Sequence, residues 1–391
     1  MSVALVAVAT SAIWLYLILG RGFFWRAAER DDDLAAPPPA VWPSVTAIVP
    51  ARNEAEVIAQ SLGSLFRQTY PGKFDIVLVN DESSDGTAQV AREAAARTGA
   101  ADRLIIMAGS APPAGWTGKL FAMNLGLRRV EAEPRPPEYV LFTDADIAYA
   151  APDAVERLVK GAEARRAVLV SLMVKLRCES LAERLLVPAF VFFFDKLYPF
   201  AWVNDPRSKV AAAAGGCMLV RREALTKAGG LQAIHGALID DCALAGLLKR
   251  EGPIWLGLTE RVVSLRPYPR FADIRRMVVR SAFAELRYSP WRLGGTLAGM
   301  SLIYLAPPLL AVFADGLARW LGLAAWLAMA LAFQPMLRLY RRSPLWGIAL
   351  PAVAAIYTAF TLESAIQYWR GRGGAWKGRY QATASAGGTA G

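Results

Sequence analysis

The chain has 391 residues, 55% of them hydrophobic, and a net charge of +11 from 44 Lys and Arg against 33 Asp and Glu. This length accommodates one α/β domain of about 250 residues together with further apolar segments, and the single histidine excludes a zinc site built from several histidines. The three cysteines show neither disulfide nor metal spacing, which fits a reducing compartment.

The first predicted element is an apolar run from Val3 to Leu19 that contains no charged residue. Its length is close to the minimum for crossing a bilayer. Arginines follow it, whereas a signal peptide carries its positive charge ahead of the apolar run. We therefore expect residues 1–21 to be an N-terminal transmembrane anchor, with the N-terminus outside and the next domain in the cytoplasm. Residues 22–43, which include three consecutive aspartates and three consecutive prolines, are predicted to be a linker.

A repeated pattern of strand, polar turn and helix follows the linker. Short apolar runs at 45–50, 74–79 and 139–142 each lead into a polar turn. Helical patterns at 54–67 and 87–98 follow the first two turns. The alternation predicts an α/β fold with a mostly parallel central sheet and helices on both faces. Ligands of such sheets bind beyond the carboxyl ends of the strands, where all three turns are expected.

Two aspartates one residue apart, Asp144 and Asp146, follow the third apolar run. Residues two apart on an extended strand point to the same side, so both carboxylates could converge on one cation. Carboxylate oxygens suit Mg²⁺ or Mn²⁺, which also bind substrate phosphates. The alternative is a chance pair of turn residues at a strand end. For the other two turns the alternative is helix capping by Asn53, Ser84 or Asp85.

Five polar motifs occur in a fixed order along this part of the chain. They are Pro50-Ala51-Arg52-Asn53-Glu54, Val79 to Thr87, Asp144-Ala145-Asp146, Ala214 to Arg222, and Ile239-Asp240-Asp241. In order and spacing they resemble the motifs of family 2 glycosyltransferases with the GT-A fold. The resemblance spans roughly residues 44–290 and implies a Rossmann-like domain that binds nucleotide sugars. With Gly115-Trp116-Thr117-Gly118-Lys119 and the flanking apolar segments, the chain is most similar to the hopanoid-biosynthesis-associated membrane glycosyltransferases.

The resemblance implies roles for the matching residues. Asp146 would hold a divalent metal, Mg²⁺ or Mn²⁺, with Asp144 contacting the metal, the sugar or the ribose. Asp241, beside Asp240, would accept the proton of the attacking hydroxyl, and attack opposite the leaving group would invert the anomeric carbon. The predicted donor-binding residues are Pro50, Ala51, Asn53, Glu54, Asp81, Lys119, Asp144 and Arg280. The predicted acceptor-binding residues are Gly215, Gly216 and Cys217.

Several of these residues have a second interpretation. Lys119 either approaches a phosphate or is a solvated lysine. Gly215 and Gly216 either let the backbone approach the ligands closely or form a bulge in a strand. The acidic pair either acts in catalysis or caps a helix before Cys242, and the two roles can coexist.

Arg280 stands where many membrane-bound relatives carry Gln-x-x-Arg-Trp, but Met277 and Ser281 replace the Gln and the Trp. It either holds the diphosphate by a bidentate fork or is a positive charge next to the membrane. Because the Gln and Trp that would grip a growing polymer are absent, we expect transfer of a single sugar rather than processive synthesis.

The C-terminal third of the chain is apolar. Stretches at 293–313, 317–337 and 345–368 predict about three membrane segments within residues 291–370, followed by a flexible basic tail over 371–391. Four spans would place the tail outside, whereas the positive-inside rule keeps it in the cytoplasm, so the number of spans stays open. Residues 181–203 are either a buried core helix or an interfacial helix that guides a lipid to the site.

The sequence thus predicts a multi-pass enzyme of the cytoplasmic (inner) membrane whose catalytic domain faces the cytoplasm. It would move one sugar from a nucleotide-diphosphate sugar to a lipid acceptor, with a hopanoid-related lipid as one candidate. Arginines beside apolar segments favour a membrane partner over a nucleic acid. The alternatives are a processive polysaccharide synthase, a nucleotidyltransferase and a catalytically inactive membrane scaffold. The first turn has no glycine, which disfavours a nucleotidyltransferase, and the site acids are all present, which disfavours a scaffold.

Overall fold

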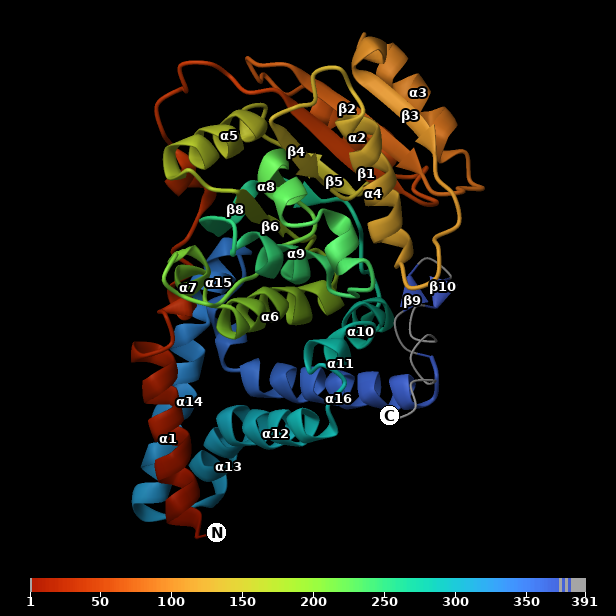
Figure 1. Ribbon diagram of the computed structural model, residues 1–391. Coiled ribbons are helices and arrows are strands. Elements are labelled where there is room, and N and C mark those ends of the chain that lie inside the picture. The colour runs from red at the N-terminus through yellow and green to blue at the C-terminus, as the bar shows by residue number, and fades with distance from the viewer. Residues whose placement is uncertain (1, 373–374, 377–378, 381–391) are drawn as a thin grey trace, which may run out of the picture. The chain divides into compact units, whose positions relative to one another are not determined.

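The computed structural model describes residues 2–372, 375–376 and 379–380 (Figure 1), and the chain divides into two compact units. The helical unit comprises residues 1–28, 178–201 and 268–375. The α/β unit comprises residues 29–177, 202–267 and 376–391. Residues 178–201 and 268–290 therefore fall in the helical unit, although the sequence placed them in the α/β domain. Most of the predicted tail over 371–391 lies outside the described residues.

The described residues of the α/β unit form an eight-stranded sheet in the order β3-β2-β1-β4-β7-β6-β8-β5. Its strands are β1 (Val45–Ala51), β2 (Phe74–Asn80), β3 (Leu104–Ala108), β4 (Tyr139–Phe142), β5 (Ile147–Tyr149), β6 (Leu169–Lys175), β7 (Met218–Arg221) and β8 (Ile254–Ser264). Two short strands, β9 (Ala375–Trp376) and β10 (Arg379–Tyr380), pair with each other.

Each unit has its own set of helices. Those of the α/β unit are α2 (Ile58–Phe66), α3 (Thr87–Arg97), α4 (Gly118–Glu131), α5 (Ala154–Arg165), α8 (Arg222–Lys227) and α9 (Asp240–Leu248). Those of the helical unit are α1 (Val3–Leu19), α6 (Leu181–Leu197), α10 (Phe271–Val279), α11 (Ala282–Glu285), α12 (Pro290–Met300), α13 (Ala306–Phe313), α14 (Gly316–Ala332), α15 (Gln334–Leu339) and α16 (Leu350–Trp369). The short α7 (Phe200–Asn204) begins in the helical unit and ends in the α/β unit.

The sheet is mixed, which corrects the prediction of a mostly parallel sheet. β1 pairs in parallel with β2 and β4, and β2 pairs in parallel with β3, so the predicted strands at 45–50, 74–79 and 139–142 are confirmed. β7 is antiparallel to both β4 and β6, and β5 is antiparallel to β8. Parallel neighbours require a crossover that returns the chain to the same edge. β7 follows the segment that contains α6 and α7. This segment does not carry the chain back to the edge at which β4 begins, so β7 can run antiparallel to β4.

Alternate residues of β1 are buried on opposite faces of the sheet. Val45 and Val49 belong to a core cluster that includes residues of α2, α3 and α5. Ile48 faces α4, since a Cβ placed on Gly126 of that helix would lie 2.6 Å from its Cγ2 atom. Helices therefore cover both faces of the central strands, as predicted. The missing side chain of Gly126 lets α4 approach the sheet closely.

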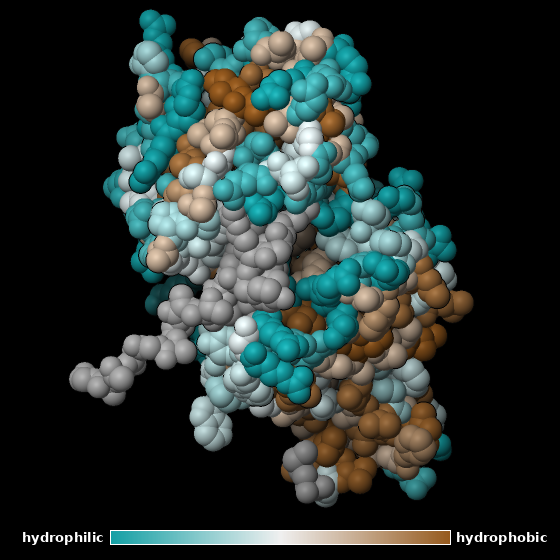
Figure 2. Space-filling view, turned by 90° about the vertical axis from the view of Figure 1, so that its right-hand side faces the viewer, coloured by the Kyte–Doolittle hydropathy of each residue, from teal (hydrophilic) through white to brown (hydrophobic). Residues whose placement is uncertain are grey.

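The helical unit carries the apolar surface of the protein. Among the described residues, Pro290–Phe313 and Gly316–Leu339 are long and apolar enough to cross a membrane by length and composition, and α1 is a shorter apolar helix. Large apolar side chains gather on the surface of this unit (Figure 2), and Trp291 reaches an exposed fraction of 91%. The third predicted stretch forms α16, several of whose residues are buried.

Two further segments bear on predictions from the sequence: the fold of residues 181–203 was left open, and residues 22–43 were predicted to be a linker. Within the helical unit, Leu186 and Phe192 of α6 are buried, and the Tyr357 hydroxyl donates to the Leu186 carbonyl at 2.9 Å. These contacts favour the buried-helix interpretation of residues 181–203. Part of the predicted linker is also packed, because Leu34 is fully buried and lies against Gly161 of α5 in the α/β unit.

Candidate active site

The polar turns that follow β1 and β2 are bound to each other at the carboxyl edge of the sheet. The Asn53 side-chain oxygen accepts from the Ser84 N–H at 2.9 Å, and the Ala55 N–H donates to Asp85 at 2.9 Å. Asn53 adopts a left-handed backbone with φ of 53°, a conformation that asparagine tolerates better than most residues. Asn53 and Ser84 thus brace a shared loop platform and do not cap a helix. Asp81 lies beneath this platform, 1% exposed.

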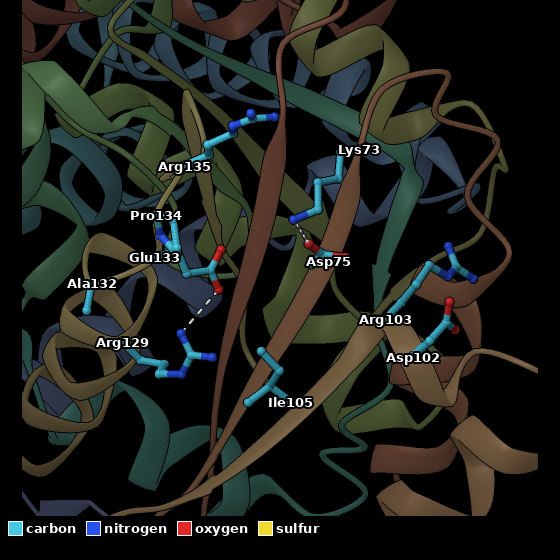
Figure 3. A pocket seen from close by; sticks show the side chains of 10 residues that line it. All are labelled: Lys73, Asp75, Asp102, Arg103, Ile105, Arg129, Ala132, Glu133, Pro134 and Arg135. Carbon is cyan, nitrogen blue, oxygen red and sulfur yellow. Dashed lines mark hydrogen bonds and ion pairs between the residues drawn. The ribbon is translucent and has the colours of Figure 1, made fainter.

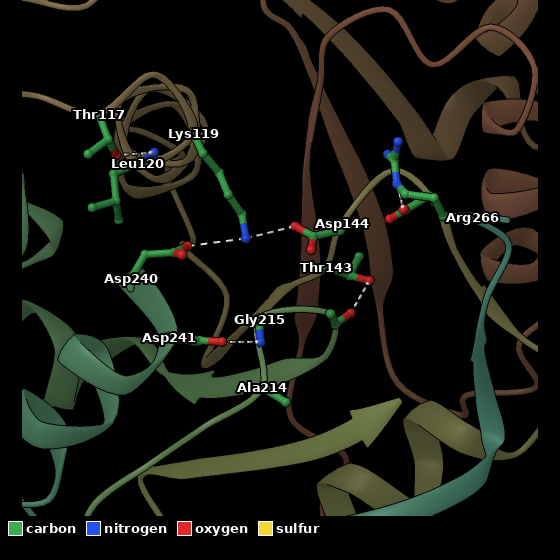
Figure 4. Close-up of polar contacts among 12 residues, drawn as sticks. Thr117, Lys119, Leu120, Thr143, Asp144, Ala214, Gly215, Asp240, Asp241 and Arg266 are labelled. Carbon is green, nitrogen blue, oxygen red and sulfur yellow. Dashed lines mark hydrogen bonds and ion pairs between the residues drawn. The ribbon is translucent and has the colours of Figure 1, made fainter. Parts of the chain in front are cut away.

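Asp144 and Asp146 lie in the turn after β4, not on an extended strand. Their carboxylates are paired separately. Asp144 is 2.9 Å from the Lys119 ammonium (Figure 4). Asp146 is 2.5 Å from the Arg266 Nε atom. In the described part of the chain, no group of three or more His, Cys, Asp or Glu residues could hold a metal ion. Each carboxylate therefore faces a different protein cation in this structure, and a divalent cation shared by the two stays a prediction. The two carboxylates still suit a Mg²⁺ or Mn²⁺ ion whose remaining ligands come from water and a diphosphate.

Lys119 is held by carboxylates from two sides. It lies in the first turn of α4, which Thr117 caps by accepting the Leu120 N–H, and the helix dipole disfavours a cation there. Its ammonium is 2.9 Å from Asp144 and 3.2 Å from Asp240. Burial lowers the pKa of Lys119, but the neighbouring carboxylates outweigh burial and raise this pKa above its usual value. With a side chain 18% exposed, Lys119 is a fixed charge of the site and not a solvated lysine.

Asp240 and Asp241 are the first two residues of α9, and Ile239 occupies the cap position without a side-chain bond. The acidic pair therefore lies in the first turn of α9 and not at its cap position. The Asp241 carboxylate accepts from the Gly215 N–H at 2.9 Å and from the Cys242 N–H at 2.8 Å. Burial and the negative charge of Asp240 raise the pKa of Asp241 to about 6. A carboxylate that titrates this close to neutral pH can serve as a general base.

Gly215 keeps the space between Asp241 and Lys119 open. A Cβ on Gly215 would lie 3.1 Å from the Lys119 Nζ atom and 3.4 Å from the Asp241 carboxylate. The Gly216 carbonyl accepts from the Thr143 hydroxyl at 2.8 Å, which ties this segment to the turn after β4. Cys217 is fully buried, and its sulfur lies 3.5 Å from the Tyr149 hydroxyl. Its side chain belongs to the core, which disfavours the acceptor contact predicted for Cys217. The acceptor role of Gly215 and Gly216 stays a prediction.

Arg266, which sequence reasoning missed, also belongs to the site. Arg266 follows β8. β7 is antiparallel to both β4 and β6, so β6 runs in the same direction as β4, and β8 is parallel to β6. β8 therefore ends at the same edge of the sheet as β4. The sequence signal that could have identified Arg266 was a positively charged residue soon after the apolar strand β8. Arg280 directly follows α10 in the helical unit, so its contact with a diphosphate stays a prediction.

Two hollows lie in the described part of the α/β unit, among others, and the smaller of these two contains site residues. A hollow of about 460 Å³ is lined by Asn53, Glu54, Ala55, Glu56, Val57, Asp85, Asp146, Arg266 and Pro267. A larger one of about 700 Å³ lies where β2 and β3 begin (Figure 3). Ion pairs such as Lys73–Asp75, at 2.9 Å, line it. Because the larger hollow is at the amino ends of the strands, it is separate from the site carboxylates at the carboxyl edge of the sheet.

Comparisons with known proteins show what this chain is similar to. Residues 46–229 match the family model described as glycosyl transferase family 2. A 4,4'-diaponeurosporenoate glycosyltransferase of Staphylococcus aureus strain bovine RF122 / ET3-1 is 33% identical over 116 residues, which is 30% of this chain and 27% of that protein. The same enzyme from strain USA300 is 32% identical over the same length and shares. The matched region thus spans about a quarter of these curated relatives.

A solved structure extends the likeness of the fold to nearly the whole chain. The mannosyltransferase PcManGT from Pyrobaculum calidifontis, solved in complex with GDP-Man and Mn²⁺, has a TM-score of 0.56 and 22% sequence identity. The alignment covers 94% of this chain and 98% of that chain. At this identity the likeness shows the fold, which is the GT-A-like α/β fold with a mixed sheet.

Proposed function

We propose that this protein is a membrane-anchored, inverting transferase. The premise is that the family-model and curated matches support a family 2 glycosyltransferase that uses a nucleotide sugar. The protein moves one sugar from a nucleotide-diphosphate sugar to a hydrophobic lipid. The observation that carries the proposal is the meeting of Asp241, Gly215 and Lys119 at the carboxyl edge of the sheet, within bonding distance of one another or of Asp144.

The chain's own residues would perform three tasks in this reaction. Asp241 accepts the proton of the acceptor hydroxyl as that oxygen attacks the anomeric carbon, and attack from the face opposite the leaving group gives inversion. The loop platform around Asn53 and the buried Asp81 hold the nucleotide. Lys119, fixed between Asp144 and Asp240, keeps these carboxylates in place and offers positive charge to the donor.

The metal proposal rests on the carboxylates of the turn after β4. Asp146 and Asp144 would hold Mg²⁺ or Mn²⁺ together with oxygens of the donor diphosphate. When bound, the ion supplies positive charge that stabilises the leaving diphosphate. The residues fit this group because both carboxylates come from one turn and carboxylate oxygens are ligands that Mg²⁺ and Mn²⁺ accept. Each carboxylate is paired with a protein cation that the ion would displace or join.

The proposals of a lipid acceptor and of the inner membrane rest on the helical unit. Two of its stretches are long and apolar enough to cross a bilayer, and its surface exposes large apolar residues such as Trp291, Phe313 and Leu317. The curated relatives act, by their name, on 4,4'-diaponeurosporenoate. We propose a hydrophobic acceptor of this kind, hopanoid-related lipids included, reached from the cytoplasmic side of the membrane.

Donor binding to the detergent-purified protein tests the proposal. Uridine- and guanosine-diphosphate sugars are titrated with Mn²⁺ and with EDTA, and binding is measured by calorimetry. We expect one donor to bind, and to bind more tightly with Mn²⁺ because the ion joins the carboxylates to the diphosphate. If the folded protein bound no donor under either condition, the assignment as a transferase would be wrong.

The rate of the chemical step should depend on the ionisation of Asp241. Because burial and Asp240 raise the pKa of Asp241 to about 6, the carboxylate is protonated below this pH and cannot accept a proton. Lys119, the cation nearest the pair, stays charged throughout this range. We therefore expect single-turnover rates to fall tenfold for each pH unit below about 6 and to level off above it. A rate that stays constant across pH 6 would contradict the assignment of the base.

A further inference from the structure

Arg266 connects two carboxylates that come from different strands. Its Nε atom is 2.5 Å from Asp146, and its Nη2 atom is 2.7 Å from Glu54 in the turn after β1. Side chains of both acids are nearly buried, at 12% and 11% exposed. Buried carboxylates require a counter-charge, since an unpaired charge removed from water is strongly destabilising. The guanidinium of Arg266 provides this charge at the lining of the smaller hollow.

The same Asp146 carboxylate is the proposed metal ligand, so two cations need it. An Asp146 oxygen that accepts a charge-assisted bond from Arg266 at 2.5 Å is not available to a metal ion in that arrangement. Arg266 itself is 33% exposed. Its side chain therefore has room to leave Asp146 while the backbone stays in place.

We infer that Arg266 is the counter-ion of Asp146 before metal binding and that a divalent cation must displace it. Arg266 thereby sets the metal affinity of the site. This inference rests on the proposed function for the role of Asp146. Once displaced, the guanidinium stays beside Glu54 at the hollow, where a diphosphate offers it a bidentate partner. Metal and nucleotide therefore bind cooperatively. The metal takes the place of Arg266 at Asp146, and the diphosphate gives the displaced guanidinium a new partner.

The test measures binding of Mn²⁺ alone, by the electron paramagnetic resonance signal of the free ion, to the full chain. Neither a donor sugar nor turnover is needed, so the result does not depend on the proposed reaction. We expect Arg266→Gln to bind Mn²⁺ about tenfold more tightly than the wild type, as fits loss of one bond between charged groups. Arg266→Lys, which cannot bridge both acids, should lie between the two. Unchanged or weaker Mn²⁺ binding in Arg266→Gln would overturn the inference.

Two controls locate the effect. Arg261→Gln makes the same change on β8, where Arg261 pairs with Asp31 and Asp32, and should leave Mn²⁺ affinity unchanged. Asp146→Asn combined with Arg266→Gln should lose the gain. If the gain persisted in this double variant, Arg266 would not act through Asp146, and the inference would fall.

A second measurement separates this inference from the proposed function. Uridine and guanosine diphosphate are titrated with and without Mn²⁺, and the ratio of the two affinities gives the coupling. Arg266→Gln should reduce this ratio relative to the wild type, whereas an equal ratio would overturn the cooperative part. If Arg266→Gln tightened Mn²⁺ binding but no variant bound either nucleotide, the proposed function would fail while the competition for Asp146 stood.

Discussion

Asp241→Asn is expected to lower the turnover rate by about 10²- to 10⁴-fold, the range that general-base catalysis contributes. An amide cannot accept the proton of the attacking hydroxyl. The substitution keeps the size of the side chain and one oxygen for the two N–H groups of Gly215 and Cys242, which the carboxylate binds in the native protein. Donor affinity should stay near that of the wild type, because Asp241 contacts neither Asp146 nor the loop platform in any described bond. Steady-state turnover and calorimetric donor binding are the two measurements.

The matched control is Glu223→Gln, the same chemical change at an exposed acid in the first turn of α8. It should leave turnover unchanged. Near-normal turnover in Asp241→Asn would show that another group accepts the proton. A loss of donor binding equal to the loss of rate would instead assign Asp241 to the binding of substrate.

Asp146→Ala is expected to weaken Mn²⁺-dependent donor binding by at least about 10- to 100-fold, since changes to residues merely behind a metal ligand already cost this much. The donor affinity measured in EDTA should change little. The ratio of the affinities in Mn²⁺ and in EDTA is therefore the quantity to compare with the wild type. This ratio separates the contribution of the metal to donor affinity from any contribution of a contact between the Arg266 guanidinium and the diphosphate.

Asp102→Ala serves as the control, since Asp102 is an exposed acid at the larger hollow, away from the carboxyl edge. It should keep both affinities. An Asp146→Ala protein that retained the full effect of Mn²⁺ would place the ion elsewhere and remove the central role given to the turn after β4.

Local patterns in the sequence were sufficient for the strands and turns that build the site. β1, β2 and β4 are buried on both faces and therefore appear in the sequence as short apolar runs. Such runs can be recognised without knowledge of the rest of the chain. Because parallel strands end at one edge, the placement of Asp81, Asp144 and Asp146 in the turns at that edge could be predicted. Asp241 and Gly215 came from the family resemblance, and their hydrogen bond agrees with it.

Other features depend on contacts between distant parts of the chain. The direction of β7 depends on the route of the chain before it. Arg266 is 120 residues from Asp146, and no local pattern marks an ion pair of that separation. The sequence also placed Asp144 and Asp146 on a strand, whereas the chain turns there so that the Asp144 carbonyl accepts from the Ile147 N–H at 3.2 Å. That turn directs the two carboxylates to different cations.

The backbone around Arg266 limits how the proposed metal site can open. The Leu265 N–H donates to the Asp146 carbonyl at 2.7 Å, Pro267 restricts its own φ, and the Tyr268 N–H donates to Glu183 at 2.7 Å within the helical unit. A flap that swings open is thus disfavoured, and rotation about the side-chain bonds of Arg266 remains. Such rotations take on the order of picoseconds to nanoseconds, against nanoseconds to microseconds for loops. Ion entry should therefore be limited by dehydration of the ion and not by the protein, so that Mn²⁺ and the slowly dehydrating Mg²⁺ would load at different speeds.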